Sequence, residues 1–116
     1  MNAAVTKKLL GLVGLGYRGR LVVVGVEQVR HAAQTHKLAF AIVAPDASRH
    51  SLDKVVPLLN AKRVRFVEGP SAAELGRSVG REATAVVGIV DRQLAKGMRE
   101  LVEAGSAAAT ESPSAQ

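Results

Sequence analysis

Short runs of β-branched residues alternate along this chain with segments in which apolar residues recur at helical spacing. The runs cover residues 21–24, 39–44, 64–67 and 83–90, and a short unbroken apolar run such as residues 21–24 is typical of a buried strand. Helical spacing covers residues 5–13, 26–33, 52–62, 71–80 and 91–105. Because strands and helices alternate, the sequence predicts an α/β fold: a three-layer α/β/α sandwich with a four-stranded, largely parallel or mixed sheet.

Several residues mark where the helices begin and end. Ser71 and Glu74 have the spacing of a capping box, in which the Ser hydroxyl and the Glu carboxylate each accept a backbone N–H. Gly80 is placed to end that helix in a left-handed conformation. Asp91 is placed to cap the last helix, and Gly105 to end it,. Pro57 lies inside a helical pattern, where it either kinks the helix or starts a new one.

The length and composition indicate one domain. A chain of 116 residues is too short for two independent cores,. We expect the domain to cover residues 1–104, and the small and polar residues 105–116 to form a disordered tail. No stretch has the roughly 20 uninterrupted apolar residues of a membrane span, and Cys is absent from the sequence. We therefore expect a cytoplasmic protein with no membrane partner and no disulfide.

Positive charge is concentrated in the first half of the chain. Through Arg65 there are eleven Lys and Arg against three Asp and Glu, and from Phe66 onward there are five against seven. The sequence pI is about 10.3. This distribution favours a polyanionic partner, most often nucleic acid. A solvated basic surface is the alternative.

Neither the glycine-rich run nor the histidines indicate catalysis. Residues 14–19 match the dinucleotide pattern G-x-G-x-x-G, but a helix precedes them and a strand follows, which is the reverse of what pyrophosphate binding requires,. His31 and His36 are five residues apart and do not share a helix face as a metal pair would. We therefore expect no catalytic residue, no metal, no cofactor and no small-molecule substrate, and we predict that the protein is not an enzyme.

The segment that follows the first strand has the character of a binding site. Gly25 comes at the end of the strand, and Glu27 and Gln28 occupy the first turn of the next helix. A carboxylate and an amide can both read the edges of bases. Arg30, His31 and Lys37 follow and can reach phosphates. An ordinary helix start with polar surface residues explains the same pattern equally well.

Four stretches, in order, resemble the L-seven-Ae and L-thirty-e family of ribosomal proteins, which bind kink-turn RNA, and in particular its bacterial members. They are residues 21–28, residues 37–46, the Val-Pro-Leu-Leu of residues 56–59, and residues 70–91 with their Leu-Gly pair and final strand. The resemblance covers residues 9–98. It implies a three-layer α/β/α sandwich and a non-enzymatic RNA-binding protein, ribosome-associated or RNA-structuring in function, which recognises a bent, non-duplex RNA.

The resemblance also implies which residues contact RNA. The widened groove of the RNA would receive the start of the helix after the first strand, that is Gly25, Glu27, Gln28 and His31, with Lys37 nearby. The loop that clamps an unstacked nucleotide would be Arg81, Glu82 and Ala83. A protein-interaction or regulatory adaptor on the same fold is the alternative, because a fold by itself does not fix a function.

Overall fold

The computed structural model describes residues 1–114, with side-chain detail as far as Gly105. The described residues form five helices and four strands, which alternate along the chain. They are α1 (Ala3–Arg18), β1 (Val22–Val24), α2 (Val26–Gln34), β2 (Phe40–Val43), α3 (Arg49–Ala61), β3 (Phe66–Glu68), α4 (Ala72–Ser78), β4 (Val86–Ile89) and α5 (Arg92–Ser114). No helix in this part of the chain combines the length and hydropathy needed to cross a membrane.

The four strands form one mixed sheet in the order β1-β4-β2-β3. β4 pairs antiparallel with both β1 and β2, and only β2 and β3 are parallel. The expectation of a largely parallel sheet is therefore wrong, and the mixed alternative is confirmed. The reason is that β4, the last strand in sequence, enters between β1 and β2 in the opposite direction to both.

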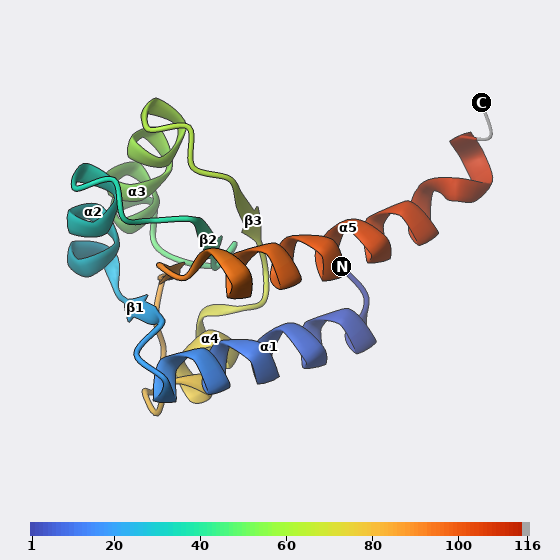
Figure 1. The fold of residues 1–116 in the computed structure, drawn as a ribbon, viewed down its shortest axis with the longest axis horizontal. Helices are drawn as coiled ribbons and strands as arrows, with labels where there is room; N and C mark the ends of the chain where they lie inside the picture. Colours follow the sequence, from blue (N-terminus) through green and yellow to red (C-terminus); the bar gives the residue numbers. More distant parts are fainter. Residues whose placement is uncertain (115–116) are drawn as a thin grey trace.

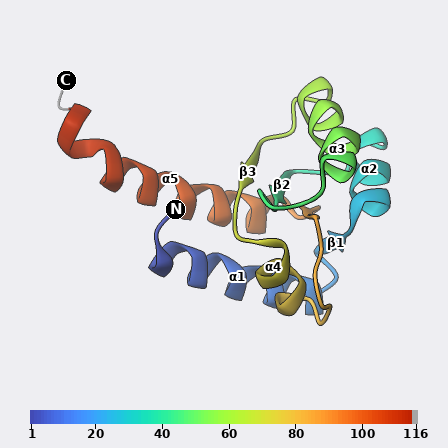
Figure 2. The same ribbon diagram turned by 180° about the vertical axis from the view of Figure 1, so that it is seen from behind.

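Helices cover both faces of the sheet, which confirms the predicted three-layer sandwich (Figures 1 and 2). On one face, α2 and α3 bury Val29, Val55 and Leu59 against β2 and β4. On the other face, α1, α4 and α5 pack on strand residues of the opposite parity, such as Phe40 and Ile42. β1, β2 and β4 therefore have apolar side chains on both faces, which is why these three strands appear in the sequence as unbroken apolar runs,.

The predicted helix caps are present. Ser71 Oγ accepts from the Glu74 N–H at 3.2 Å, and Glu74 Oε1 accepts from the Ser71 N–H at 3.0 Å. Gly80 has a φ of 74° just beyond the end of α4. Asp91 Oδ2 accepts from the Leu94 N–H at 2.8 Å in the first turn of α5. All three sequence signals depend on residues no more than a few positions apart, and all three are confirmed.

The predicted end of the last helix is wrong, because α5 continues through Gly105 to Ser114. A Cβ at Gly105 would lie 2.8 Å from Cγ2 of Val5 in α1, so the glycine allows α1 and α5 to approach closely. Two expectations remain predictions: that residues 1–104 form a single RNA-binding domain, and that residues 105–116 form a disordered tail. Residues 115–116 of that predicted tail lie outside the described part of the chain.

The helix that contains Pro57 also differs from its prediction. α3 begins earlier, at Arg49, where Ser48 Oγ accepts the Ser51 N–H at 3.1 Å. It continues through Pro57 to Ala61 as a single helix, so no new helix begins at the proline. Pro57 is exposed, which leaves its ring room on the solvent side.

The glycine-rich run is structural, as its order in the sequence predicted. Gly14 and Gly16 are buried inside α1, and Gly19 is the residue at which α1 ends. A Cβ at Gly16 would lie 2.5 Å from Cδ2 of Leu94 and 2.9 Å from Cγ2 of Val22. Gly16 therefore brings α1 close to α5 and β1, and the run opens no helix whose N-terminus could hold a pyrophosphate.

Candidate nucleic-acid interface

Gly25 connects β1 to α2 with a backbone that few other residues adopt. Its φ of 95° and ψ of 161° belong to a region that is almost restricted to glycine,. Its N–H donates to the Val86 carbonyl at 3.0 Å, which ties the start of α2 to the start of β4. No side chain caps the first turn of α2. The polar side chains of that turn are therefore presented to solvent at a fixed position on the sheet.

A groove of about 450 Å³ runs along α2 beside the edge strand β1. Four of the predicted contact residues line it, namely Glu27, Gln28, His31 and Lys37. All four are exposed. The structure therefore brings together, on one surface, a carboxylate, an amide, an imidazole and an ammonium group.

The groove also has apolar lining that the sequence analysis missed. Its further lining residues are Val23, Ala32, Thr35 and Val90. The helical spacing held a signal for two of them, because Ala32 lies four residues after Gln28 and Thr35 four residues after His31. Val23 and Val90 come from β1 and from the end of β4, and only the pairing of these strands places them beside α2.

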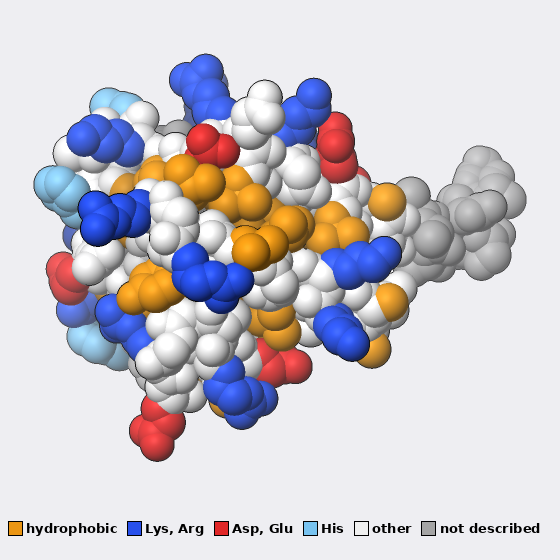
Figure 3. Space-filling view, turned by 60° about the horizontal axis from the view of Figure 1, so that its bottom comes forward, with side chains coloured by type: hydrophobic (Ala, Val, Ile, Leu, Met, Phe, Trp, Pro, Cys, Tyr) orange, Lys and Arg blue, Asp and Glu red, His pale blue; other side chains and the backbone are white. Residues whose placement is uncertain are grey.

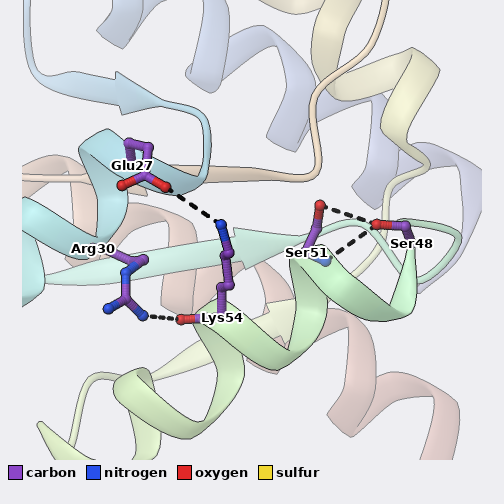
Figure 4. A network of polar contacts seen from close by, with 5 residues as sticks. All are labelled: Glu27, Arg30, Ser48, Ser51 and Lys54. Carbon is purple, nitrogen blue, oxygen red and sulfur yellow. Dashed lines mark hydrogen bonds and ion pairs between the residues drawn. The ribbon is translucent and has the colours of Figure 1, made fainter.

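Arg30 does not line this groove. It lies on the side of α2 that faces α3, where its Nη1 donates to the backbone carbonyl of Lys54 (Figure 4). Lys54 Nζ in turn lies 3.8 Å from Oε2 of Glu27 (Figure 4). Both partners of this ion pair are substantially exposed, with 81% of the Glu27 side chain accessible. Such a pair is weak, so Glu27 remains available to a ligand.

The predicted clamp loop lies at the same end of the sheet as the start of α2. Arg81, Glu82 and Ala83 are exposed and lead into β4, whose first residue, Val86, accepts the hydrogen bond from Gly25. The loop is fixed on α4, because the Arg81 N–H donates to the Gly76 carbonyl at 2.8 Å. The two predicted contact segments, 25–28 and 81–83, are therefore neighbours at one end of the sheet.

A metal site is not formed in the described part of the chain, where no three His, Asp or Glu side chains lie close enough together to share an ion. The groove instead offers hydrogen-bonding groups around an apolar floor. Groups of this kind suit a ligand with flat apolar faces and polar edges, and unstacked bases have this character.

The mixed four-stranded sheet and the groove beside α2 define a small α/β/α domain with its candidate ligand site at an edge strand. The chain matches the Ribosomal protein L7Ae/L30e/S12e/Gadd45 family over residues 7–102, and it belongs to that family. The resemblance found in the sequence is thereby confirmed.

Relatives and solved structures agree with this assignment. RNA-binding protein YlxQ of Bacillus subtilis (strain 168) is 33% identical over 92 residues, which are 79% of this chain and 92% of the relative. RNA-binding protein YlxQ of Enterococcus faecium is 32% identical over 103 residues, which are 89% and 99% of the two chains.

Two solved structures have the same fold. A Bacillus halodurans protein of unknown function superposes with a TM-score of 0.77 at 27% identity, over 83% of this chain and 97% of the other. The Giardia lamblia 15.5kD RNA binding protein superposes with a TM-score of 0.74 over 92% of both chains. At 24% identity, this second likeness concerns the fold alone.

Proposed function

We propose that this protein is a non-enzymatic, cytoplasmic RNA-binding protein that recognises a bent, non-duplex RNA element such as a kink-turn, in a ribosome-associated or RNA-structuring role. Membership of the family supports the proposal, as does the name RNA-binding protein that both YlxQ relatives carry. The observation that carries it is the groove beside α2, which combines Glu27, Gln28, His31 and Lys37 around an apolar floor.

Each part of the groove has a separate role in this proposal. Glu27 accepts hydrogen bonds from amino and imino groups of bases, and Gln28 both donates and accepts. His31 and Lys37 contact phosphates. The neighbouring loop of Arg81, Glu82 and Ala83 holds a nucleotide that leaves the stack. Base contacts give selectivity among RNAs, and phosphate contacts give affinity without selectivity.

This division of roles is tested with three RNAs: a kink-turn, a straightened version of it and an unrelated hairpin. Gln28→Ala is expected to lose discrimination by about 1–3 kcal/mol, the range for a paired base contact. Lys37→Ala is expected to weaken all three RNAs about equally and to reduce the dependence of log affinity on log salt by about 1. If Gln28→Ala leaves the order of preference among the three unchanged, the start of α2 does not read the RNA.

One observation favours a second candidate, a protein-interaction adaptor. A separate groove of about 440 Å³ lies between α1 and α5 and is lined by Leu12, Leu15 and Leu101, and Leu15 is 60% exposed. Figure 3 shows a band of hydrophobic side chains across this face. Leu15→Glu is a control in the RNA experiment. If RNA occupies the α2 groove, the RNA affinity of Leu15→Glu is expected to be unchanged. A loss of RNA affinity would indicate that the α1–α5 face takes part in RNA binding.

A further inference from the structure

The fold gathers basic side chains at one end of the sheet. β1, β2 and β3 begin at this end and β4 finishes there, since Val22 and Phe40 both lie opposite Ile89. The segments that enter and leave the strands at this end carry six exposed basic residues besides Arg65, and we call these six residues the basic end. They are Arg18, Arg20, Lys37, Lys62, Arg63 and Arg92.

Backbone hydrogen bonds hold three of these residues around the end of the α2 groove that Lys37 and Val90 line. The Val90 N–H donates to the Leu21 carbonyl at 2.9 Å, which places Arg20 and Arg92 on neighbouring segments. The Ala39 N–H donates to the Ile89 carbonyl at 2.8 Å, which brings the segment of Lys37 to the same place. Val90 and Lys37 themselves line the groove. The groove therefore opens onto the basic end.

The charge of the basic end is little compensated within the described residues. None of its six members forms an ion pair there, whereas Arg65 nearby is paired with Glu103 at 2.8 Å. The Asp91 carboxylate accepts the Leu94 N–H as the cap of α5.

The opposite end of the sheet has a different charge character. The helix starts and loops there carry four exposed carboxylates beside the exposed Arg49 and Arg81; they are those of Glu27, Asp46, Glu68 and Glu82. Carboxylates repel phosphates but can accept from base amino groups. The groove thus leads from an end suited to bases toward an end suited to phosphates.

We propose that the basic end binds the phosphates of a double-helical RNA segment that flanks the element held in the α2 groove. This inference rests on the proposed function, because it extends the same RNA along α2. The helix has nine residues and is therefore about 13 Å long, which sets how far the basic end lies from the contacts at the start of α2. A kink-turn with stems much shorter than this does not reach the basic end.

The test compares a kink-turn RNA with minimal stems and versions in which one stem or the other is extended by about one helical turn. The variant Arg20→Gln/Arg92→Gln removes two charges of the basic end, and Lys7→Gln/Lys8→Gln removes two charges from the far half of α1 as a matched control. Between about 50 and 200 mM salt, two phosphate contacts correspond to about a tenfold change in affinity. Raising the salt concentration over this range is expected to weaken the binding of one extended RNA about tenfold more in wild type than in Arg20→Gln/Arg92→Gln.

The outcomes separate this inference from the proposed function. On minimal stems, wild type and Arg20→Gln/Arg92→Gln are expected to bind alike and to keep the same preference for the kink-turn. If wild type prefers the kink-turn but Arg20→Gln/Arg92→Gln and the Lys7→Gln/Lys8→Gln control show the same salt dependence, this inference is overturned. The proposed function is not affected by that result. Absence of RNA binding by wild type overturns both. If polyglutamate displaces the extended RNA as effectively as an RNA of the same charge does, the basic end is instead a site for acidic proteins.

Discussion

Gly76→Ala tests how the loop of Arg81, Glu82 and Ala83 is held. Gly76 is buried in α4, and a Cβ there would lie 2.5 Å from Cα and 2.6 Å from N of Ala83. Both contacts are with backbone, so no side chain can rotate away. To reach an ordinary carbon–carbon contact the loop must retreat by about 1 Å. The hydrogen bond from the Arg81 N–H to the Gly76 carbonyl, now 2.8 Å long, would then be strained.

The size of the effect follows from two opposing contributions. Overpacking of this kind costs about 1–3 kcal/mol, and replacing a helical glycine by alanine returns about 0.5–1 kcal/mol. We therefore expect Gly76→Ala to lower the free energy of unfolding by about 1 kcal/mol, near the middle of a range from about 0 to about 2.5 kcal/mol. Gly11→Ala in α1 is the matched control, because a Cβ there would have nothing within 4 Å. It is expected to raise the free energy of unfolding by about 0.5–1 kcal/mol.

Urea unfolding followed by far-ultraviolet circular dichroism measures both changes. RNA binding of folded Gly76→Ala is also expected to lose part of its preference for a kink-turn over a straightened RNA, because the proposed clamp loop is displaced. Stability of Gly76→Ala equal to or above that of Gly11→Ala would refute the packing argument. Reduced stability with unchanged preference would refute the role of the loop in RNA recognition.

Three further changes give distinct results. Gly25→Ala is expected to lower the free energy of unfolding by about 1–3 kcal/mol because φ is 95° there; no loss in a urea titration would mean that the turn relaxes freely. Asp91→Ala removes the cap from the Leu94 N–H and is expected to cost about 1 kcal/mol in thermal or urea unfolding, whereas Asp91→Asn should recover most of it. His31→Gln is expected to weaken a kink-turn, a straightened RNA and an unrelated hairpin about equally, because the proposed role of His31 is a phosphate contact. A changed preference among the three RNAs would contradict that role.

The alternation of strands and helices was readable because it depends on which side chains are apolar and at what spacing. The runs that became β1, β2 and β4 could be found without any partner strand, because both of their faces are covered. The segment 64–67 was placed about two residues early, since β3 covers Phe66–Glu68. β3 is a short edge strand, so its limits depend on pairing with β2 rather than on its own apolar pattern.

Two glycines show the limit of predicting structure from the local sequence. Gly80 and Gly105 both follow helical segments in the sequence, and both were expected to end a helix. Gly80 does stand in a left-handed conformation after α4, but Gly105 lies inside α5 against Val5. The difference lies in the neighbouring helix α1, about 100 residues away in the chain, and no local pattern contains that information.

The sequence by itself determined the order of strands and helices, three helix-end signals and the polar face of α2, because each depends on residues within a few positions of one another. Only the tertiary structure decided the insertion of β4 between β1 and β2, the turning of Arg30 toward α3, and the apolar floor that Val23 and Val90 give the groove. It also decided the gathering of basic residues from four separate segments at one end of the sheet. These features depend on contacts between residues that are distant in sequence, and such contacts are set by how the whole core packs, not by local backbone preference.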